Sequence, residues 1–115
     1  MQTSVEQRGD VIAVHVSGSV DGHTAEGLQH VFSREVEAGH HHLVADFGGV
    51  DYTSSAGLRV LLATLKQTRS RGGDLRLAAP HPEVRKVLDL SGFTSILSVF
   101  ATVDDAVSSF RGHGD

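Results

Sequence analysis

The sequence predicts an α/β fold whose sheet contains parallel strands. Short runs rich in Val, Ile and Leu alternate with longer segments in which apolar residues recur every three or four positions. After an initial strand pair, the order is helix, strand, helix, strand, helix, strand and helix, which implies parallel pairings joined by right-handed crossovers. A length of 115 residues suits one domain, residues 1–115, and an apolar fraction of 39% is typical of a globular chain.

The N-terminal third predicts an edge strand, a second strand and a helix. Residues 4–7 are a candidate for a short edge strand before a turn at residues 8–10. Apolar and polar side chains alternate in residues 11–20, which is typical of a strand with one buried face. Thr24 is a candidate N-cap of the following helix and Gly39 its candidate stop. The apolar stripe of this helix consists of Ala25, Leu28, Phe32 and Val36.

The remaining chain continues the alternation. The apolar run at residues 43–47 predicts a central parallel strand that ends at Gly48-Gly49. A helix over residues 55–71 and a strand over residues 75–79 follow. A third helix begins near Pro82, with Val84, Val87 and Leu88 on its buried side. The order ends with a strand near residues 96–100, a helix from Val103 with Thr102 as N-cap, and a frayed segment at residues 111–115.

Composition argues against several classes of function. The chain has no cysteine, which excludes disulfides and thiolate chemistry and fits the cytoplasm, where we expect the protein. A net charge of −4 without a basic cluster argues against nucleic acid as a partner. The N-terminus has no signal peptide pattern, and no segment approaches the roughly 20 apolar residues of a membrane span. No nucleotide-binding loop, zinc-protease helix motif or nucleophile elbow occurs, so we expect neither an enzyme nor a cofactor.

Residues 46–58 combine a strand end, two glycines and three hydroxyl residues before a helix. Sites in α/β sheets form beyond the carboxyl ends of strands, and a helix N-terminus stabilises a phosphate through its unpaired N–H groups. Phosphorylation of a serine there adds a charge of about −2 and changes a docking surface. From the residues alone, a plain N-cap role remains the alternative. Gly57 costs the helix up to about 1 kcal/mol relative to alanine, which fits close approach by a partner.

Residues 50–58, Val-Asp-Tyr-Thr-Ser-Ser-Ala-Gly-Leu, followed by Leu61 and Leu62, resemble the signature of the STAS domain family. That family includes the bacterial anti-sigma factor antagonists. Three further stretches resemble the family in the same order: residues 18–28, 71–75 and 87–93. The resemblance covers roughly residues 11–110. It implies a mixed sheet of about four to five strands with about four helices, packed largely on one face of the sheet.

The resemblance also implies a function as a partner switch. In this family the unphosphorylated antagonist binds a serine-kinase anti-sigma factor, phosphorylation of a serine breaks the complex, and a metal-dependent serine phosphatase reverses the modification. The phosphorylated serine falls on Ser55; Ser54 stands where the family usually has aspartate and is an alternative acceptor. The implied partner-binding residues are Asp21, Tyr52, Thr53, Ser54, Ala56, Gly57, Leu58 and Arg59. We expect a monomer or weak dimer, and the alternative function is a non-phosphorylated accessory subunit of a transporter or stressosome-like assembly.

Other polar groups have simpler interpretations. Arg59 lies one turn after Ser55 and can pair with a phosphate or with a partner's carboxylate, or remain solvated. The adjacent histidines at residues 40–42 alternate in direction, so we predict no metal site there. Asp104 and Asp105 fit the first turn of a helix, where they stabilise its dipole. The scattered histidines are expected on the surface: His15, His23, His30 and His81.

Overall fold

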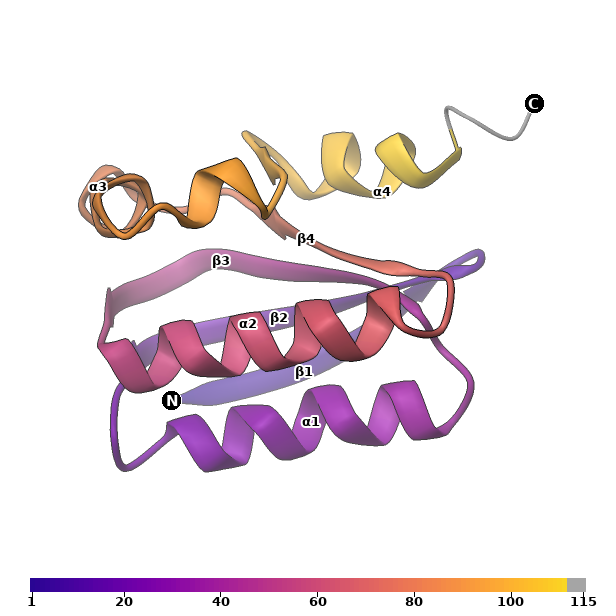
Figure 1. Cartoon of the computed structure of the whole chain (residues 1–115), viewed down its shortest axis with the longest axis horizontal. Coiled ribbons are helices and arrows are strands. Elements are labelled where there is room, and N and C mark those ends of the chain that lie inside the picture. The colour runs from indigo at the N-terminus through magenta and orange to yellow at the C-terminus, as the bar shows by residue number, and fades with distance from the viewer. Residues whose placement is uncertain (112–115) are drawn as a thin grey trace.

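The centre of the structure is a mixed sheet with the strand order β1-β2-β3-β4-β5 (Figure 1). The computed structural model describes residues 1–111, in which β1 runs antiparallel to β2 and the other neighbouring strands are parallel. The strands are β1 (Gln2–Arg8), β2 (Val11–Val20), β3 (His42–Thr53), β4 (Asp74–Ala78) and β5 (Val99–Phe100). The helices are α1 (Ala25–Glu37), α2 (Ser55–Arg69), α3 (Pro82–Leu90), α4 (Val103–Arg111) and the short 3-10 helix η1 (Phe93–Ser95). The predicted α/β fold is confirmed.

Two hydrophobic clusters lie on opposite faces of this sheet. Successive side chains of a strand point to opposite faces, and in β2 Ile12 and Val14 join one cluster while Val11 and Ala13 join the other. Helices α1, α2 and α3 contribute their buried residues to the first cluster, and α4 contributes to the second. Within residues 1–111, three of the four α-helices therefore pack on one face, as predicted, and α4 packs on the other.

Strand β3 is longer than the sequence predicts. Gly48 and Gly49 do not end it, because the strand continues to Thr53 in parallel pairing with β2. The pairing shifts register between His15 and Ser17 and again between Gly18 and Ser19, which is typical of bulges that glycine permits. A Cβ atom at Gly49 would lie 2.8 Å from that of Ser17, so glycine allows the two strands to approach. The expected glycine loop before α2 is thus strand.

The C-terminal elements differ from expectation in three further places. Strand β5 has two residues instead of the predicted 96–100, because residues 96–98 form an irregular turn between η1 and β5. Strand β4 ends at Ala78, since Ala79 has a left-handed φ of 57°. Val87 is 38% exposed, whereas Val84 and Leu88, four residues apart, form the buried side of α3. The prediction that Val87 belongs to the buried side of α3 is therefore wrong.

The helix ends are also partly different. Thr24 precedes α1, but its side chain forms no capping hydrogen bond to that helix. The predicted cap of α4 is confirmed, since the N–H of Asp105 donates to the Thr102 hydroxyl at 3.0 Å. Helix α2 ends at Arg69 and α4 at Arg111. The rest of the segment expected to fray, residues 112–115, lies outside the described residues.

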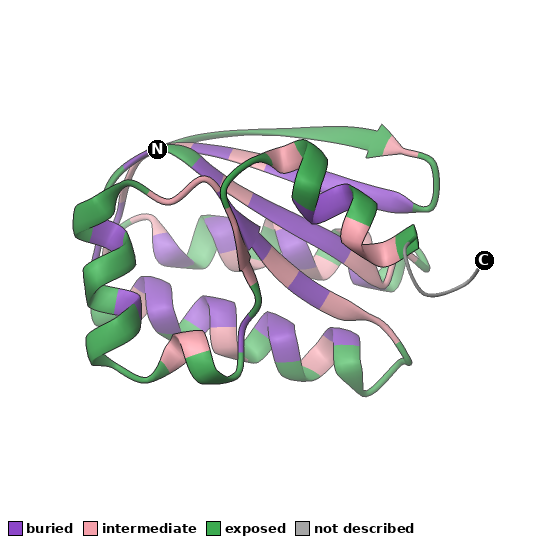
Figure 2. Ribbon diagram, turned by 90° about the horizontal axis from the view of Figure 1, so that it is seen from above, coloured by how far each residue is buried: buried purple, intermediate pink, exposed green. Residues whose placement is uncertain are grey.

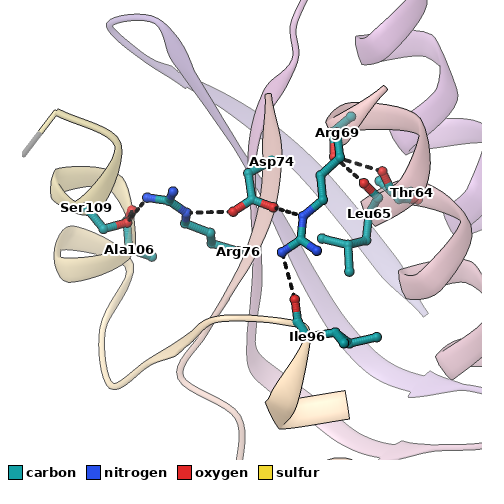
Figure 3. A network of polar contacts seen from close by, with 9 residues as sticks. Thr64, Leu65, Arg69, Asp74, Arg76, Ile96, Ala106 and Ser109 are labelled. Atoms are coloured by element: carbon teal, nitrogen blue, oxygen red, sulfur yellow. Dashed lines mark hydrogen bonds and ion pairs between the residues drawn. The ribbon is translucent and has the colours of Figure 1, made fainter. Parts of the chain in front are cut away.

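A polar network around Asp74 joins elements from both faces of the sheet (Figure 3). The Asp74 carboxylate accepts hydrogen bonds at 3.0 Å from Arg69, at the end of α2, and from Arg76 on β4. Arg69 also donates to the carbonyl oxygen of Ile96 at 2.7 Å, and Arg76 donates to the Ser109 hydroxyl of α4 at 2.7 Å. One carboxylate on the central sheet thereby fixes two arginines that reach α4 and the segment before β5.

Candidate functional site

The candidate site lies at the carboxyl ends of β2 and β3, where α2 begins. Ser54 is the single residue between β3 and α2, and its N–H donates to the carbonyl oxygen of Val20 at 2.9 Å. This hydrogen bond attaches the start of α2 to the end of β2. The edge of a parallel sheet at which strands end is the usual place for sites in this fold class.

The two adjacent serines have different environments. The Ser54 hydroxyl accepts a hydrogen bond from the N–H of Ala56 at 3.2 Å, so Ser54 is the N-cap of α2, and it is half-buried. Ser55 is the first residue of the helix and is exposed. No acidic residue occurs in the first turn of α2, which leaves the positive end of the helix dipole without a compensating carboxylate of its own helix.

Gly57 and Thr53 lie beneath the serines. Thr53 is 4% exposed and Gly57 is buried. A Cβ atom at Gly57 would overlap the Thr53 hydroxyl and lie 2.9 Å from Cγ1 of Val20. The packing of α2 on the ends of β2 and β3 therefore leaves no room for a side chain at residue 57, which explains the glycine.

The predicted partner-binding residues divide into an exposed and a supporting set. Tyr52 is 55% exposed, and Ser55 and Arg59 are exposed as well. Thr53, Gly57 and Leu58 are buried, and Leu58 joins the core beneath α2. Half-buried members are Ser54, Ala56 and Asp21. Arg59 forms no hydrogen bond or ion pair with another side chain in residues 1–111, so its guanidinium is available to an incoming group.

Asp21 organises the turn between β2 and α1. Its Oδ1 accepts hydrogen bonds from the N–H of His23 at 2.9 Å and from the N–H of Thr24 at 3.2 Å. The backbone N–H of His23, followed by the groups of Thr24, lowers the pKa of Asp21 below its usual value, so this carboxylate stays ionised. The Thr24 hydroxyl accepts from the N–H of Asp21 and donates to the carbonyl oxygen of Ser19, each at 2.9 Å. Thr24 therefore closes the turn instead of capping the helix.

A hollow between β3 and α3 was not predicted from the sequence. Its volume is about 120 Å³, and its lining residues are Asp51, Tyr52, Thr53, Glu83, Val84 and Val87. Leu90, one turn beyond Val87 on α3, is 79% exposed. The sequence signal for this surface is the number of apolar residues in α3. Besides the buried Val84 and Leu88, the helix contains Val87 and Leu90, which the core does not cover.

His40 and His42, at the two ends of the histidine run, have different neighbours. His40 Nδ1 contacts the Glu35 carboxylate at 2.9 Å, and the ring of His42 stacks on Phe110 with centroids 5.0 Å apart. Across residues 1–111, no three His, Cys, Asp or Glu side chains are placed to hold a metal ion. In the same part of the chain, no helix has both the length and the apolar character that crossing a membrane requires.

Comparison with known proteins identifies the family. The STAS domain family matches residues 2–106. BtrV of Bordetella bronchiseptica, which carries the name of an anti-sigma factor antagonist, is 35% identical over 111 residues, 96% of each chain. The crystal structure of an anti-sigma factor antagonist from Mycobacterium paratuberculosis is 31% identical with a TM-score of 0.88, over 96% of this chain and 93% of that one.

A third likeness concerns the fold alone. The Bacillus cell fate determinant SpoIIAA, solved in its phosphorylated form, has 21% identity and a TM-score of 0.75, over 96% of this chain and all of that one, 100%. The chain therefore belongs to the STAS domain family, and its relatives are named as anti-sigma factor antagonists.

Proposed function

We propose that this protein is a cytoplasmic anti-sigma factor antagonist that acts by partner switching. In its unmodified form it binds a serine-kinase anti-sigma factor, and phosphorylation of Ser55 releases it. A metal-dependent serine phosphatase then restores the unmodified protein. The observation that carries this proposal is the exposed hydroxyl of Ser55 at the uncompensated N-terminus of α2.

The proposed reaction transfers a phosphoryl group from ATP to the Ser55 hydroxyl. In the transfer, the Ser55 oxygen bonds to the γ-phosphorus of ATP, the bond to ADP breaks, and the hydroxyl proton leaves to a base of the kinase. The kinase supplies ATP and its metal; this protein contributes an accessible hydroxyl. The product carries about −2 charge next to the free N–H groups of α2, which stabilise it without loss of the helix.

Ser55 is the preferred acceptor over Ser54. The Ser54 hydroxyl accepts the N–H of Ala56 and is half-buried, so its phosphorylation would disturb the cap of α2. Ser55 has no such task. The phosphorylated form of SpoIIAA supports modification as a mechanism in this fold.

The docking face that we propose surrounds Ser55. Tyr52, Val87 and Leu90 provide exposed apolar side chains, and Arg59 provides a cation on the next turn of α2. Before modification, Arg59 can contact a carboxylate of the kinase. After modification, the phosphate on Ser55 competes for Arg59, since the two positions are four residues apart on one helix.

The test is capture of partners from the native cytoplasm, followed by mapping of phosphorylated residues by mass spectrometry. We expect the wild type and Ser55→Ala to retain the kinase, Ser55→Asp to lose it, and the phosphate to be found on Ser55. Ser54→Ala tests the alternative acceptor, and the phosphate should still be found on Ser55 in this variant. Equal retention by Ser55→Ala and Ser55→Asp contradicts the proposal, and a stable complex without phosphoserine would favour the accessory-subunit alternative.

A further inference from the structure

The hollow between β3 and α3 has the dimensions of a receptor for one side chain. Its volume of about 120 Å³ is far below the roughly 300–1,000 Å³ that small-molecule sites occupy. Thr53, which lines it, lies two residues before Ser55. A group that enters the hollow would therefore belong to the molecule docked over the start of α2.

The walls of the hollow are apolar and its rim is acidic. Val84 is buried in the floor, whereas Tyr52 and Val87 are 55% and 38% exposed and can still contact an incoming chain. Asp51 and Glu83 line this hollow and also an adjoining one shared with His81 and Pro82. The two carboxylates thus stand on the border between the hollows.

Neither carboxylate is neutralised by the protein itself. Within residues 1–111, Asp51 and Glu83 form no ion pair, and Lys86, three residues after Glu83 on α3, is not paired with it. The nearby His81 is hydrogen-bonded through Nε2 to the carbonyl oxygen of Gly48 at 2.6 Å, and not to either carboxylate. The rim therefore presents about two unpaired negative charges beside an aromatic ring.

We propose that this hollow receives an arginine side chain of the partner protein. The methylene groups pack against Tyr52 and Val87, and the guanidinium lies between Asp51 and Glu83. This inference rests on the proposed function in one respect, because the arginine belongs to the anti-sigma factor that docks around Ser55.

Charge and shape together favour a guanidinium over other occupants. An anionic group would be repelled by both carboxylates, and a purely apolar side chain would cover them without giving them a partner. A guanidinium is planar, is weakly hydrated for a cation, stacks on aromatic rings and offers five donors to two carboxylates. Such a contact sets the orientation of docking and the choice of partner more than the total affinity.

The experiment is an NMR titration of the full-length protein with N-acetyl-arginine amide and with N-acetyl-citrulline amide, a neutral isostere. We expect the arginine amide to give saturable shifts at the amides of Tyr52, Glu83 and Val87. Its affinity should exceed that of the citrulline amide about three- to tenfold. The double variant Asp51→Asn/Glu83→Gln should abolish the difference between the two probes, whereas Asp104→Asn on α4 should preserve it.

Equal affinity of the two probes, or an arginine preference that survives in Asp51→Asn/Glu83→Gln, would overturn the inference. Thermal unfolding of each variant establishes that a loss of binding is not a loss of fold. The proposed function is tested by a different measurement, the capture of the kinase. If Ser55→Ala and Ser55→Asp retain the kinase equally, the proposed switch is wrong, whatever the arginine probe shows. Ser55→Ala and Ser55→Asp should both bind the arginine probe as the wild type does.

Discussion

Two adjacent serines have different environments because one precedes helix α2 and the other is its first residue. Ser54 satisfies a backbone N–H of α2 and is tied to the end of β2. Ser55 is exposed. The sequence predicted both hydroxyls at the helix start but left open which of them is the acceptor. The structure shows which of them is the N-cap, which the pattern alone could not, since either serine could have capped the helix.

Removal of the Ser54 hydroxyl should destabilise the protein, and removal of the Ser55 hydroxyl should not. Ser54→Ala loses the cap of α2 and should reduce the free energy of unfolding by about 1 kcal/mol. Ser55→Ala changes an exposed side chain and should stay within about 0.5 kcal/mol of the wild type. Urea denaturation of the two variants tests this order, and a larger loss for Ser55→Ala would contradict the assignment of the cap.

Gly57→Ala should destabilise the protein although alanine is the better helix former. The added methyl group overlaps the Thr53 hydroxyl and crowds Val20, and overpacking of this kind costs about 1–3 kcal/mol. The double variant Thr53→Ala/Gly57→Ala should recover part of the loss, because it removes the overlapping oxygen. Strictly additive losses in chemical denaturation would show that the two side chains do not compete for the same space.

At the scale of elements, β1 is a separate case because its side chains are almost entirely exposed (Figure 2). Besides its backbone pairing with β2, it is held by Arg8, which contacts Asp104 at 2.7 Å, and by Glu6. His15 on β2 contacts Glu6 through Nε2 at 2.9 Å and Asp46 on β3 through Nδ1 at 2.6 Å. Expected as a surface residue, His15 instead links three strands.

The link through His15 should make stability depend on pH. The hydrogen bond with Asp46, assisted by the one with Glu6, raises the pKa of His15 above its ordinary value of 6.5 against the opposing effect of burial. The stabilisation is therefore fully present below pH 6.5 and is lost as the pH rises through the higher pKa of the folded state. His15→Gln should flatten this part of the stability profile in urea denaturation.

Glu6→Gln offers a matched test, because it removes one of the two carboxylates and keeps the size of the side chain. The pKa of His15, followed by NMR, should fall toward 6.5 in this variant. An unchanged titration would contradict the role of Glu6.

The elements were predictable where periodicity is strong, and less so where backbone geometry decides. The stripe of Leu28, Phe32 and Val36 defined α1 correctly, since buried residues of a helix recur at this spacing. The predicted end of β3 at Gly48 and Gly49 was wrong because glycine can end a strand but also permits a bulge within one. The prediction for Val87 was wrong because its spacing fits two places equally well. An apolar residue at this position of a helix can lie in the core or at the edge of a surface hollow.

At the scale of the whole molecule, two hydrophobic clusters and the Asp74 network hold the layers together. The order of elements was predictable from the sequence, but the placement of α4 on the opposite face was not. That placement depends on contacts between residues far apart in the chain, such as Val11 with the cluster that contains Val107. The hollow beside Tyr52 likewise depends on how α3 packs against the end of β3.

Asp74→Asn should reduce the free energy of unfolding by roughly 1–3 kcal/mol, because two arginines lose a charged acceptor at a site that is largely buried. Asp104→Asn is the matched control, since it breaks the exposed ion pair with Arg8 and should cost less than about 1 kcal/mol. Equal effects of the two substitutions in urea denaturation would contradict the structural importance of the Asp74 network.

The proposed switch is tested most directly by measuring the affinity of the captured kinase for the unmodified protein and for protein phosphorylated stoichiometrically at Ser55. A phosphate at the centre of the docking face should weaken the complex about tenfold or more, and treatment with a serine phosphatase should restore the original affinity. Equal dissociation constants for the two forms would contradict the claim that Ser55 controls the choice of partner.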